Sequence, residues 1–386
     1  MTIFLKSVSI LKYIEEIKMG KNIIALVASL IVALNIYPQV NDEIKFSKLE
    51  EIHQYLSKRA EENEFSGVVL IAKDGKPIFK NAYGYASKRF AVPNAIDTKF
   101  NIGSLSKHIT SIAILQLAEK GLLNLDDPIG TYLNVFPDNI AKKVTTKNLL
   151  TMSSGWGDYW DNETYLAHRY EYRTVTDYIN FIKDIPLDFE PGTDMQHSNI
   201  GFEVAGAIIE NVSNQNYYDY VRKNIYAPAE MSNSDSYDID GPAKNLAVGY
   251  TNENPNDTVK TGYNWSNVYI RLPARGTPTG GSYSTVEDLF KLVQAHRDYK
   301  LLSKDYTNYL LNFFQGNLGD TPDIMKKGII FMFGGAEGVG AALGLDMMDD
   351  DIRKGYTIVI LSNYDFTVTE NLYSKIKQFV KYIKAQ

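Results

Sequence analysis

Strand patterns stand near both ends of this 386-residue chain, and helical patterns fill its long middle. Near the N-terminal end, residues 68–72 form an apolar run, the Asp-Gly pair at 74–75 is a strong hairpin turn, and residues 78–83 indicate the returning strand. Near the C-terminal end, residues 341–348 and 356–361 indicate a second pair of strands around an acidic turn. This arrangement predicts one sheet that is assembled from both ends of the chain.

Three helical patterns lie between these strands, and a fourth follows them. Residues 104–120 indicate an amphipathic helix that stops at Gly121, residues 199–212 indicate a second helix, and residues 284–287 (STVE) form a capping box before a third. The last helix is expected over about 369–383. We therefore predict an α/β (α+β) fold, in which an antiparallel sheet from the N- and C-terminal segments is flanked by helices and carries an inserted, mainly helical lobe.

The part of the chain that follows the N-terminus is expected to be one catalytic domain, residues 42–386, because no Pro/Ser-rich linker or repeat divides it. Its sheet lobe would comprise about 45–100 and 325–386. Its mainly helical lobe would comprise about 101–324, and the active site would lie between the two lobes.

An apolar run of 12 residues, 23–34, precedes this domain, and no charge follows it until Asp42. The run is shorter than the roughly 20 residues of a membrane-spanning helix and matches the apolar region of a secretory signal peptide. We predict that residues 1–41 are an export segment whose true start is Met19, and that the protein is periplasmic or extracellular. A buried core helix is the alternative, and an uncleaved segment would anchor the chain in a membrane.

Composition excludes several kinds of chemistry. Lys and Arg number 40 and Asp and Glu number 46, so the net charge of −6 disfavours a nucleic-acid partner. The absence of cysteine excludes disulfides, thiol nucleophiles and cysteine-ligated metals. The five histidines form no HxH or HExxH pattern, so we expect neither a metal nor another cofactor. Any nucleophile is therefore expected to be an oxygen.

The strongest candidate for that nucleophile is Ser104, which precedes Lys107 by three residues. A serine and a lysine at this spacing share one helix face, and a lysine whose pKa is lowered by burial can deprotonate the hydroxyl. The same SxxK pattern begins at Ser9 and at Ser374. Only Ser104 opens a long apolar helix after the flexible Gly103. Ser9 lies before the apolar run of the export segment, and Ser374 lies on a polar helix face.

Six stretches of the chain resemble, in order, the serine beta-lactamase and penicillin-binding-protein superfamily. The closest likeness is to its class C beta-lactamase-like branch of esterases, D-aminopeptidases and related peptidases of the S12 type. The stretches are residues 65–86, 100–129, 148–155, 189–210, 276–294 and 355–365. The resemblance implies a beta-lactamase/transpeptidase-like fold in which Ser104 is acylated and Lys107 activates it.

The second motif of the family, Tyr-x-Asn after a Pro-Gly turn, here has a histidine in place of the tyrosine. The residues after Pro191-Gly192 include His197 and Asn199. Histidine suits the proton transfer that the tyrosine performs, because its ordinary pKa is about 6.5. The resemblance implies that His197 is catalytic and that Asn199 orients Lys107 or the substrate amide; a structural histidine is the alternative.

The third motif, Lys-Thr-Gly or His-x-Gly on the strand beside the active site, aligns with residues 331–340. Phe333 stands where a lysine or histidine is expected, followed by Gly334, Gly335 and Ala336. The glycines still allow close approach of a substrate, and the backbone N–H of Ala336 could pair with that of Ser104 as an oxyanion hole. Losing the polar side chain disfavours substrates with a carboxylate, such as beta-lactams.

Two further groups of residues are left open by the sequence. Arg271 and Arg275 could supply the missing positive charge. An aromatic group could line a substrate cleft or could simply pack in the core. Its members are Trp156, Tyr159, Trp160, Tyr165, Tyr170 and Tyr172.

We therefore expect an exported serine hydrolase that forms an acyl-enzyme at Ser104 with an amide or ester. The expected partner is a small substrate, namely a D-amino-acid peptide, a peptidoglycan fragment or a small ester. The alternatives are a catalytically inactive member that binds peptides or cell-wall fragments, and a true beta-lactamase. The departures at His197 and Phe333 motivate the first alternative, and Phe333 disfavours the second.

Overall fold

The computed structural model describes residues 47–252, 265–313, 329–348 and 351–384. Two compact units divide the chain, one over Leu56–Ile376 and the other formed by residues 1–55 together with 377–386. In the described part of the smaller unit, the rings of Tyr55 and Phe379 lie 6.3 Å apart. The predicted export segment and its start at Met19 lie outside the described residues.

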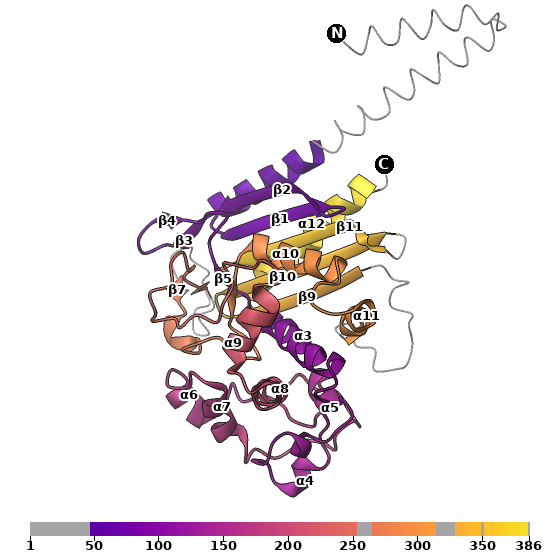
Figure 1. Ribbon diagram of the computed structural model, residues 1–386. Coiled ribbons are helices and arrows are strands. Elements are labelled where there is room, and N and C mark those ends of the chain that lie inside the picture. Colours follow the sequence, from indigo (N-terminus) through magenta and orange to yellow (C-terminus); the bar gives the residue numbers. More distant parts are fainter. Residues whose placement is uncertain (1–46, 253–264, 314–328, 349–350, 385–386) are drawn as a thin grey trace, which may run out of the picture. The chain divides into compact units, whose positions relative to one another are not determined.

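An antiparallel five-stranded sheet forms the centre of the larger unit, with strand order β2-β1-β11-β10-β9 (Figure 1). Its strands are β1 (Gly67–Lys73), β2 (Lys76–Tyr83), β9 (Ile329–Ala336), β10 (Val339–Met348) and β11 (Asp351–Ser362). Strand β11 pairs with β1 on one side and with β10 on the other, so that Ser362 lies opposite both Gly67 and Gly340. The predicted sheet from both ends of the chain is thus confirmed.

The inner strand β1 is buried on both faces, which explains its continuous apolar run. Val68 and Leu70 of β1 belong to the main core, whereas the alternate residues Val69 and Ile71 are equally buried on the opposite face. Helix α10 (Val286–Arg297) contacts β1 and β11.

Helix α12 (Phe366–Lys384) approaches strand β10 closely, at two of its glycines. A side chain added at Gly340 would meet Thr369, and one added at Gly344 would meet Tyr373. The helix and the sheet can therefore pack this tightly only because these two strand positions have no side chain.

Helix α3 (Ser106–Glu119) is the central helix of the larger unit and lies between the sheet and a mainly helical region (Figure 1). Every residue from Ser106 to Leu117 is buried, so the expectation of an amphipathic helix is wrong. A helix enclosed on all sides needs no polar face. Its neighbours include α8 (Asn199–Ser213) and α11 (Lys304–Phe313).

Shorter helices complete the helical region, which the figure shows gathered on one side of α3 (Figure 1). They are α4 (Asp138–Ala141), α5 (Thr146–Leu150), α6 (Glu163–His168), α7 (Val175–Ile182) and α9 (Tyr217–Val221). The predicted inserted, mainly helical lobe is confirmed as a feature of the fold.

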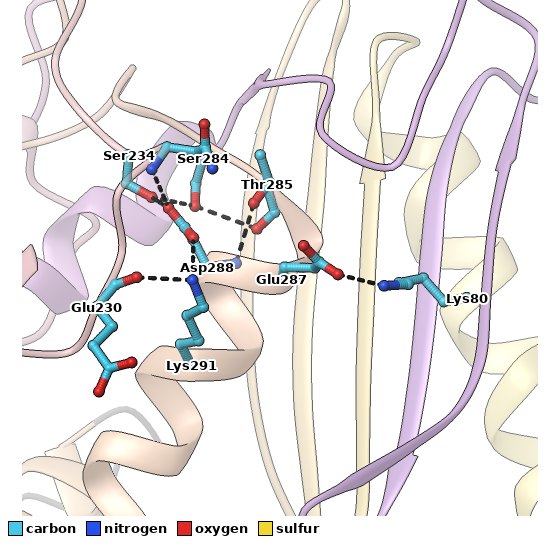
Figure 2. Close-up of polar contacts among 9 residues, drawn as sticks. Lys80, Glu230, Ser234, Ser284, Thr285, Glu287, Asp288 and Lys291 are labelled. Atoms are coloured by element: carbon cyan, nitrogen blue, oxygen red, sulfur yellow. Dashed lines mark hydrogen bonds and ion pairs between the residues drawn. The ribbon is translucent and has the colours of Figure 1, made fainter.

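The N-terminal cap of α10 lies one residue later than the sequence indicates. Thr285 caps the helix, because its side chain accepts from the backbone N–H of Asp288. Ser284, the expected cap, instead hydrogen bonds with Ser234 at 2.8 Å (Figure 2). Asp288 also accepts from Ser234, so this buried cluster ties the start of α10 to a distant loop.

Among the residues that the structure describes, no helix combines the length and hydrophobicity of a membrane span.

Candidate active site

Ser104 lies in a single 3₁₀ turn, Gly103–Leu105, between strand β5 (Phe100–Asn101) and helix α3. Gly103 has a φ of +50°, and a side chain there would come within 2.8 Å of the backbone nitrogen of Gly335 on β9. Only glycine satisfies both the positive φ and this close approach. The turn therefore places Ser104 directly beside the edge strand of the sheet.

The loop at residues 276–281 (GTPTGG) fixes this turn from the other side. The backbone N–H of Gly281 donates to the carbonyl of Gly103, and the N–H of Thr277 donates to the carbonyl of Gly280. Beyond the loop, the N–H of Ser282 donates to the Ser106 hydroxyl at 3.2 Å. These contacts bring the carbonyl of Thr279 beside the start of α3, where it accepts a hydrogen bond from Lys107.

Lys107 is buried and directs its ammonium nitrogen toward three neutral oxygens. Its Nζ lies 3.2 Å from Ser104 Oγ, 2.6 Å from Asn199 Oδ1 and 2.8 Å from the carbonyl of Thr279. The side chain thus touches the predicted nucleophile and the predicted second-motif asparagine without touching a carboxylate.

Burial lowers the pKa of Lys107 to about 7, because the charged form loses its hydration. Asp158 and Glu203 oppose this shift through their negative charges, with Asp158 exerting the larger effect. The amine is therefore substantially uncharged near neutral pH, which is the form that can accept a proton from Ser104.

Asp158 connects Asn199 with His197. Its Oδ2 accepts from Asn199 Nδ2 at 2.7 Å and lies 3.4 Å from His197 Nδ1. Its Oδ1 accepts from the backbone N–H groups of Tyr159 and Trp160. Burial alone would raise the pKa of Asp158, but hydrogen bonds from His197, Asn199 and these N–H groups lower it below its ordinary value.

Glu203 is a second carboxyl group of the site and lies one helical turn beyond Asn199 on α8. It is fully buried and accepts a hydrogen bond from the Tyr159 hydroxyl at 2.9 Å. Burial raises its pKa to about 7, against the opposing effects of its hydrogen bonds and of Lys107. The site therefore contains a lysine and a glutamate that both titrate near neutrality.

A cavity of about 350 Å³ opens beside Ser104 and is called the first cavity. It is lined by Asn101, Gly103, Ser104, Asp158, Tyr159, Trp160, His197, Asn199, Leu272, Pro273, Thr277, Thr279, Gly280, Gly281, Gly335, Ala336 and Val339. Cavities of this size admit small-molecule ligands, and the mixture of amide, hydroxyl and carboxylate groups with apolar walls is typical of a binding site.

The structure brings most of the predicted site residues together. Ser104, Lys107 and Asn199 are in direct contact, whereas His197 joins them through Asp158 and has a side chain that is 54% exposed. Gly335 and Ala336 line the first cavity.

The two remaining third-motif residues lie beside the first cavity rather than in its wall. Gly334 is buried where a side chain would collide with the carbonyl of Ile102. Phe333 does not line the first cavity, and its ring packs edge-on against Phe366 and Tyr373.

Three residues of the site were not predicted from the sequence, namely Asp158, Glu203 and Thr279. Asp158 follows the family-like stretch at 148–155 within a loop of aromatic residues, and Thr279 lies in the GTPTGG stretch. Both regions are close to or within stretches that carry the family resemblance, but their sequence does not indicate which polar atom reaches Lys107 or Asn199. Glu203 could have been found from the sequence, because it is a charged residue within an apolar helix pattern, and such residues are seldom buried without a partner.

The residues that the sequence left open now have positions. Arg271 pairs with Glu337 at 2.6 Å, and Arg275 stacks on the ring of Tyr218, so neither lines the first cavity. Of the aromatic group, Tyr159 and Trp160 line the cavity.

The other members of the aromatic group do not line the first cavity. Trp156 and Tyr165 are buried in the core, Tyr172 packs against it and Tyr170 is exposed. Two members of the aromatic group therefore line a cavity, and the others pack in the core or lie at the surface.

Comparison with known proteins identifies the family of the chain. The family model described as Beta-lactamase matches residues 52–375. PbpX of Bacillus subtilis (strain 168), which carries the name of a penicillin-binding protein, is 30% identical over 315 residues, covering 81% of this chain and 74% of PbpX.

Solved structures show the same fold. The crystal structure of a penicillin binding protein from Bacillus halodurans is 26% identical, with a TM-score of 0.70 over 86% of this chain and 99% of that one. A D-amino acid amidase from Ochrobactrum anthropi SV3, at 18% identity and a TM-score of 0.69 over 88% of this chain and 99% of that one, shares the fold. The chain belongs to the Beta-lactamase family of beta-lactamase-fold serine hydrolases.

Proposed function

We propose that the protein is an exported serine hydrolase that cleaves an amide or ester through an acyl-enzyme at Ser104. The observation that carries this proposal is the 3.2 Å contact between Ser104 Oγ and the Nζ of a buried lysine. All three contacts of that nitrogen are to neutral oxygens, so the lysine can be uncharged at neutral pH and act as a general base.

The reaction would proceed in two steps. Lys107 accepts the hydroxyl proton while Ser104 Oγ forms a bond to the substrate carbonyl carbon. The bond to the leaving group then breaks, and the leaving group departs with a proton from the site. Water next attacks the acyl-enzyme, giving its proton to the site and releasing the acid and the free serine.

His197 suits the second proton-transfer role in this scheme. It lines the first cavity together with Ser104, and Asp158 faces its Nδ1. A ring held by Nδ1 presents its Nε2 on the opposite side for proton transfer to a leaving group or from water. Asp158 is therefore a positioning residue, which acts on the substrate through His197.

Backbone N–H groups can stabilise the oxyanion that forms during acylation. Ser104 lies in the first turn of its helix, where N–H groups have no intrahelical acceptor. Ala336 ends strand β9 and lines the same cavity. We assign the oxyanion hole to these two groups, because the role needs a backbone donor and tolerates the loss of the motif side chain at Phe333.

The substrate classes that we propose are a D-amino-acid peptide, a peptidoglycan fragment or a small ester. The D-amino acid amidase fold and the penicillin-binding-protein names of relatives support the first two. Export rests on the apolar run at 23–34, and the division into a sheet lobe and a mainly helical lobe with the site between them remains part of the proposal.

A fluorophosphonate probe tests the proposal, because it forms a covalent adduct only with an activated serine. We expect labelling of the protein at Ser104, loss of labelling in Ser104→Ala, and full labelling in the control Ser374→Ala. Ser374 begins another SxxK pattern but lies exposed on α12. If neither this probe nor a panel of acyl donors modifies Ser104, the protein is a non-catalytic binder. Rapid hydrolysis of nitrocefin would instead support a beta-lactamase.

A further inference from the structure

A second cavity, of about 410 Å³, also has Ser104 in its wall. It is lined by Ser104, Leu105, Lys107, His108, Met152, His197, Met332, Phe333, Gly335 and Phe366. Ser104, His197 and Gly335 line both this cavity and the first. The nucleophile therefore stands where two spaces meet, and a substrate bound at Ser104 can place a different group in each.

Four half-buried apolar side chains form much of the second cavity, which we call the apolar chamber: Met152, Met332, Phe333 and Phe366. The Phe333 ring lies edge-on to Phe366 at 5.6 Å and to Tyr373 at 5.4 Å, which holds it in place. A ligand that covers half-buried aromatic and thioether groups removes apolar surface from water, and this lowers the free energy of the complex.

The chamber offers a carboxylate no fixed positive partner. Neither arginine nor an acidic residue is among its described lining residues. Its three basic residues have other partners. Lys107 directs its nitrogen to Asn199 and Thr279, His108 is buried with its Nε2 2.8 Å from that of His296, and His197 has Asp158 3.4 Å from its Nδ1. A charged group entering this space would lose its hydration without an ion pair.

The first cavity differs in kind, because Asn101, Asp158, Asn199 and Thr279 contribute polar atoms to its wall. The two spaces therefore distinguish the two sides of a substrate. One side meets hydrogen-bonding groups, and the other meets methionine and phenylalanine side chains.

We propose that the apolar chamber binds an uncharged aliphatic or aromatic group attached directly to the scissile ester or amide. This inference rests on the proposed hydrolase function of Ser104 and names the class of substrate that the site selects. A cavity of about 150 Å³ holds one benzene ring, so the chamber has room for a phenyl group or an acyl or alkyl chain of several carbons.

Two series of esters test the proposal with the unmodified protein. In one series the acyl chain of a p-nitrophenyl ester grows from acetate to hexanoate, and in the other the alcohol of an acetate ester grows from ethyl to hexyl. We expect kcat/KM to rise about threefold per methylene in at least one series, as burial of each group in an apolar pocket predicts. A flat or falling profile in both series would overturn the proposal.

A charge swap gives a sharper test within the series that rises. Replacing the terminal methyl of the substrate by a carboxylate should lower kcat/KM at least tenfold. In Phe333→Lys the ratio of the charged to the neutral substrate should recover about tenfold. The control Phe90→Lys makes the same change at a side chain that is 73% exposed, outside the chamber, and should leave the ratio unchanged.

Comparing two substrates on one variant cancels any change in the reactivity of Ser104. If Phe333→Lys does not fold, Met152→Lys introduces the same charge from the helical side of the chamber, outside the ring cluster of Phe333. An unchanged ratio in a folded chamber variant contradicts the proposal. Failure of the fluorophosphonate to label Ser104 would instead contradict the hydrolase function itself, so the two failures are distinguishable.

Discussion

Two lysines of this protein lie near the start of a helix, each with a carboxylate in its cluster, but they differ in burial and in contact with that carboxylate. Lys107 lies in the first turn of α3, and Lys291 lies near the start of α10, where it pairs with Asp288 at 3.4 Å (Figure 2). Lys291 is 40% exposed and touches a carboxylate, whereas Lys107 is buried and has hydrogen-bond contacts with neutral oxygens.

The difference between them is where the negative charge lies. In the α10 cluster the carboxylate of Asp288 is itself buried and satisfied by Ser234 and by the backbone N–H of Asn233. In the cluster at the start of α3, Asp158 contacts Asn199 and not Lys107, so the Asn199 amide lies between the two charged groups. A lysine kept out of direct contact with its counter-charge can lose its proton, and this is the property that the proposed role of Lys107 as a general base requires.

The largest expected effect is that of removing the amine of Lys107. Lys107→Met should lower the rate of fluorophosphonate acylation at pH 7 by about 10²- to 10⁴-fold, the usual contribution of a general base. The matched change Lys291→Met should alter that rate less than twofold. Equal losses in both variants would show that the contrast between the clusters has no catalytic meaning.

The reverse experiment removes the buried carboxylate of the α10 cluster. Asp288→Ala should lower the free energy of unfolding by about 3 kcal/mol, because buried donors lose their charged acceptor. The acylation rate of the folded protein should stay unchanged.

A neighbouring carboxylate is the control for this stability experiment. Glu287 pairs with Lys80 at the surface (Figure 2), and Glu287→Ala should cost less than about 1 kcal/mol, as for other exposed ion pairs. Urea unfolding measures both variants, and similar losses in the two would contradict the structural role of Asp288.

Much of the fold could be predicted from local patterns, because apolar runs and turns depend on neighbouring residues. Residues 68–72 and 356–361 were identified correctly as strands, and both lie in the sheet as β1 and β11. The cap of α10 was misplaced because Ser284 and Thr285 are both good caps. The contact of Ser284 with Ser234, 50 residues away, is a tertiary contact that local patterns do not contain.

The contacts of the candidate site also include some that local spacing predicts and others that depend on tertiary packing. Ser104 and Lys107 are three residues apart, so helical spacing alone predicted their contact. Asp158 lies 41 residues before Asn199, and no spacing rule joins a loop carboxylate to a helix amide. Its position follows only from the packing of the helical region.

Asp158 is the carboxylate that Asn199 separates from Lys107. Asp158→Asn should lower kcat about tenfold, since a charged acceptor of His197 is lost. It should also move the acid limb of the pH–rate profile to lower pH, because the charge of Asp158 raises the pKa of Lys107. Asp161→Asn, an exposed carboxylate in the same loop, is the control. A loss of activity with no shift of the limb would assign Asp158 a purely structural role.

The smallest expected effect comes from Glu203, whose charge is buried and acts on Lys107 from a distance. Glu203→Gln keeps a side chain that can accept from Tyr159 and removes the charge that raises the pKa of Lys107. The acid limb should therefore move to lower pH by less than one unit, and by less than in Asp158→Asn. Glu210→Gln, on the same helix, should leave the limb in place.

Stability gives an independent measurement of the same group. The pKa of Glu203 is raised from 4.5 to about 7, so the folded protein keeps a proton that the unfolded chain has lost between these values. The contribution of Glu203 to the free energy of unfolding should consequently fall as pH rises through this window. Subtracting the pH profile of Glu203→Gln from that of the unmodified protein separates it from the opposite contributions of His108 and His296, whose pKa values burial lowers. Parallel profiles for the two proteins would contradict the raised pKa of Glu203 and would show that this carboxyl group is ionised throughout the window.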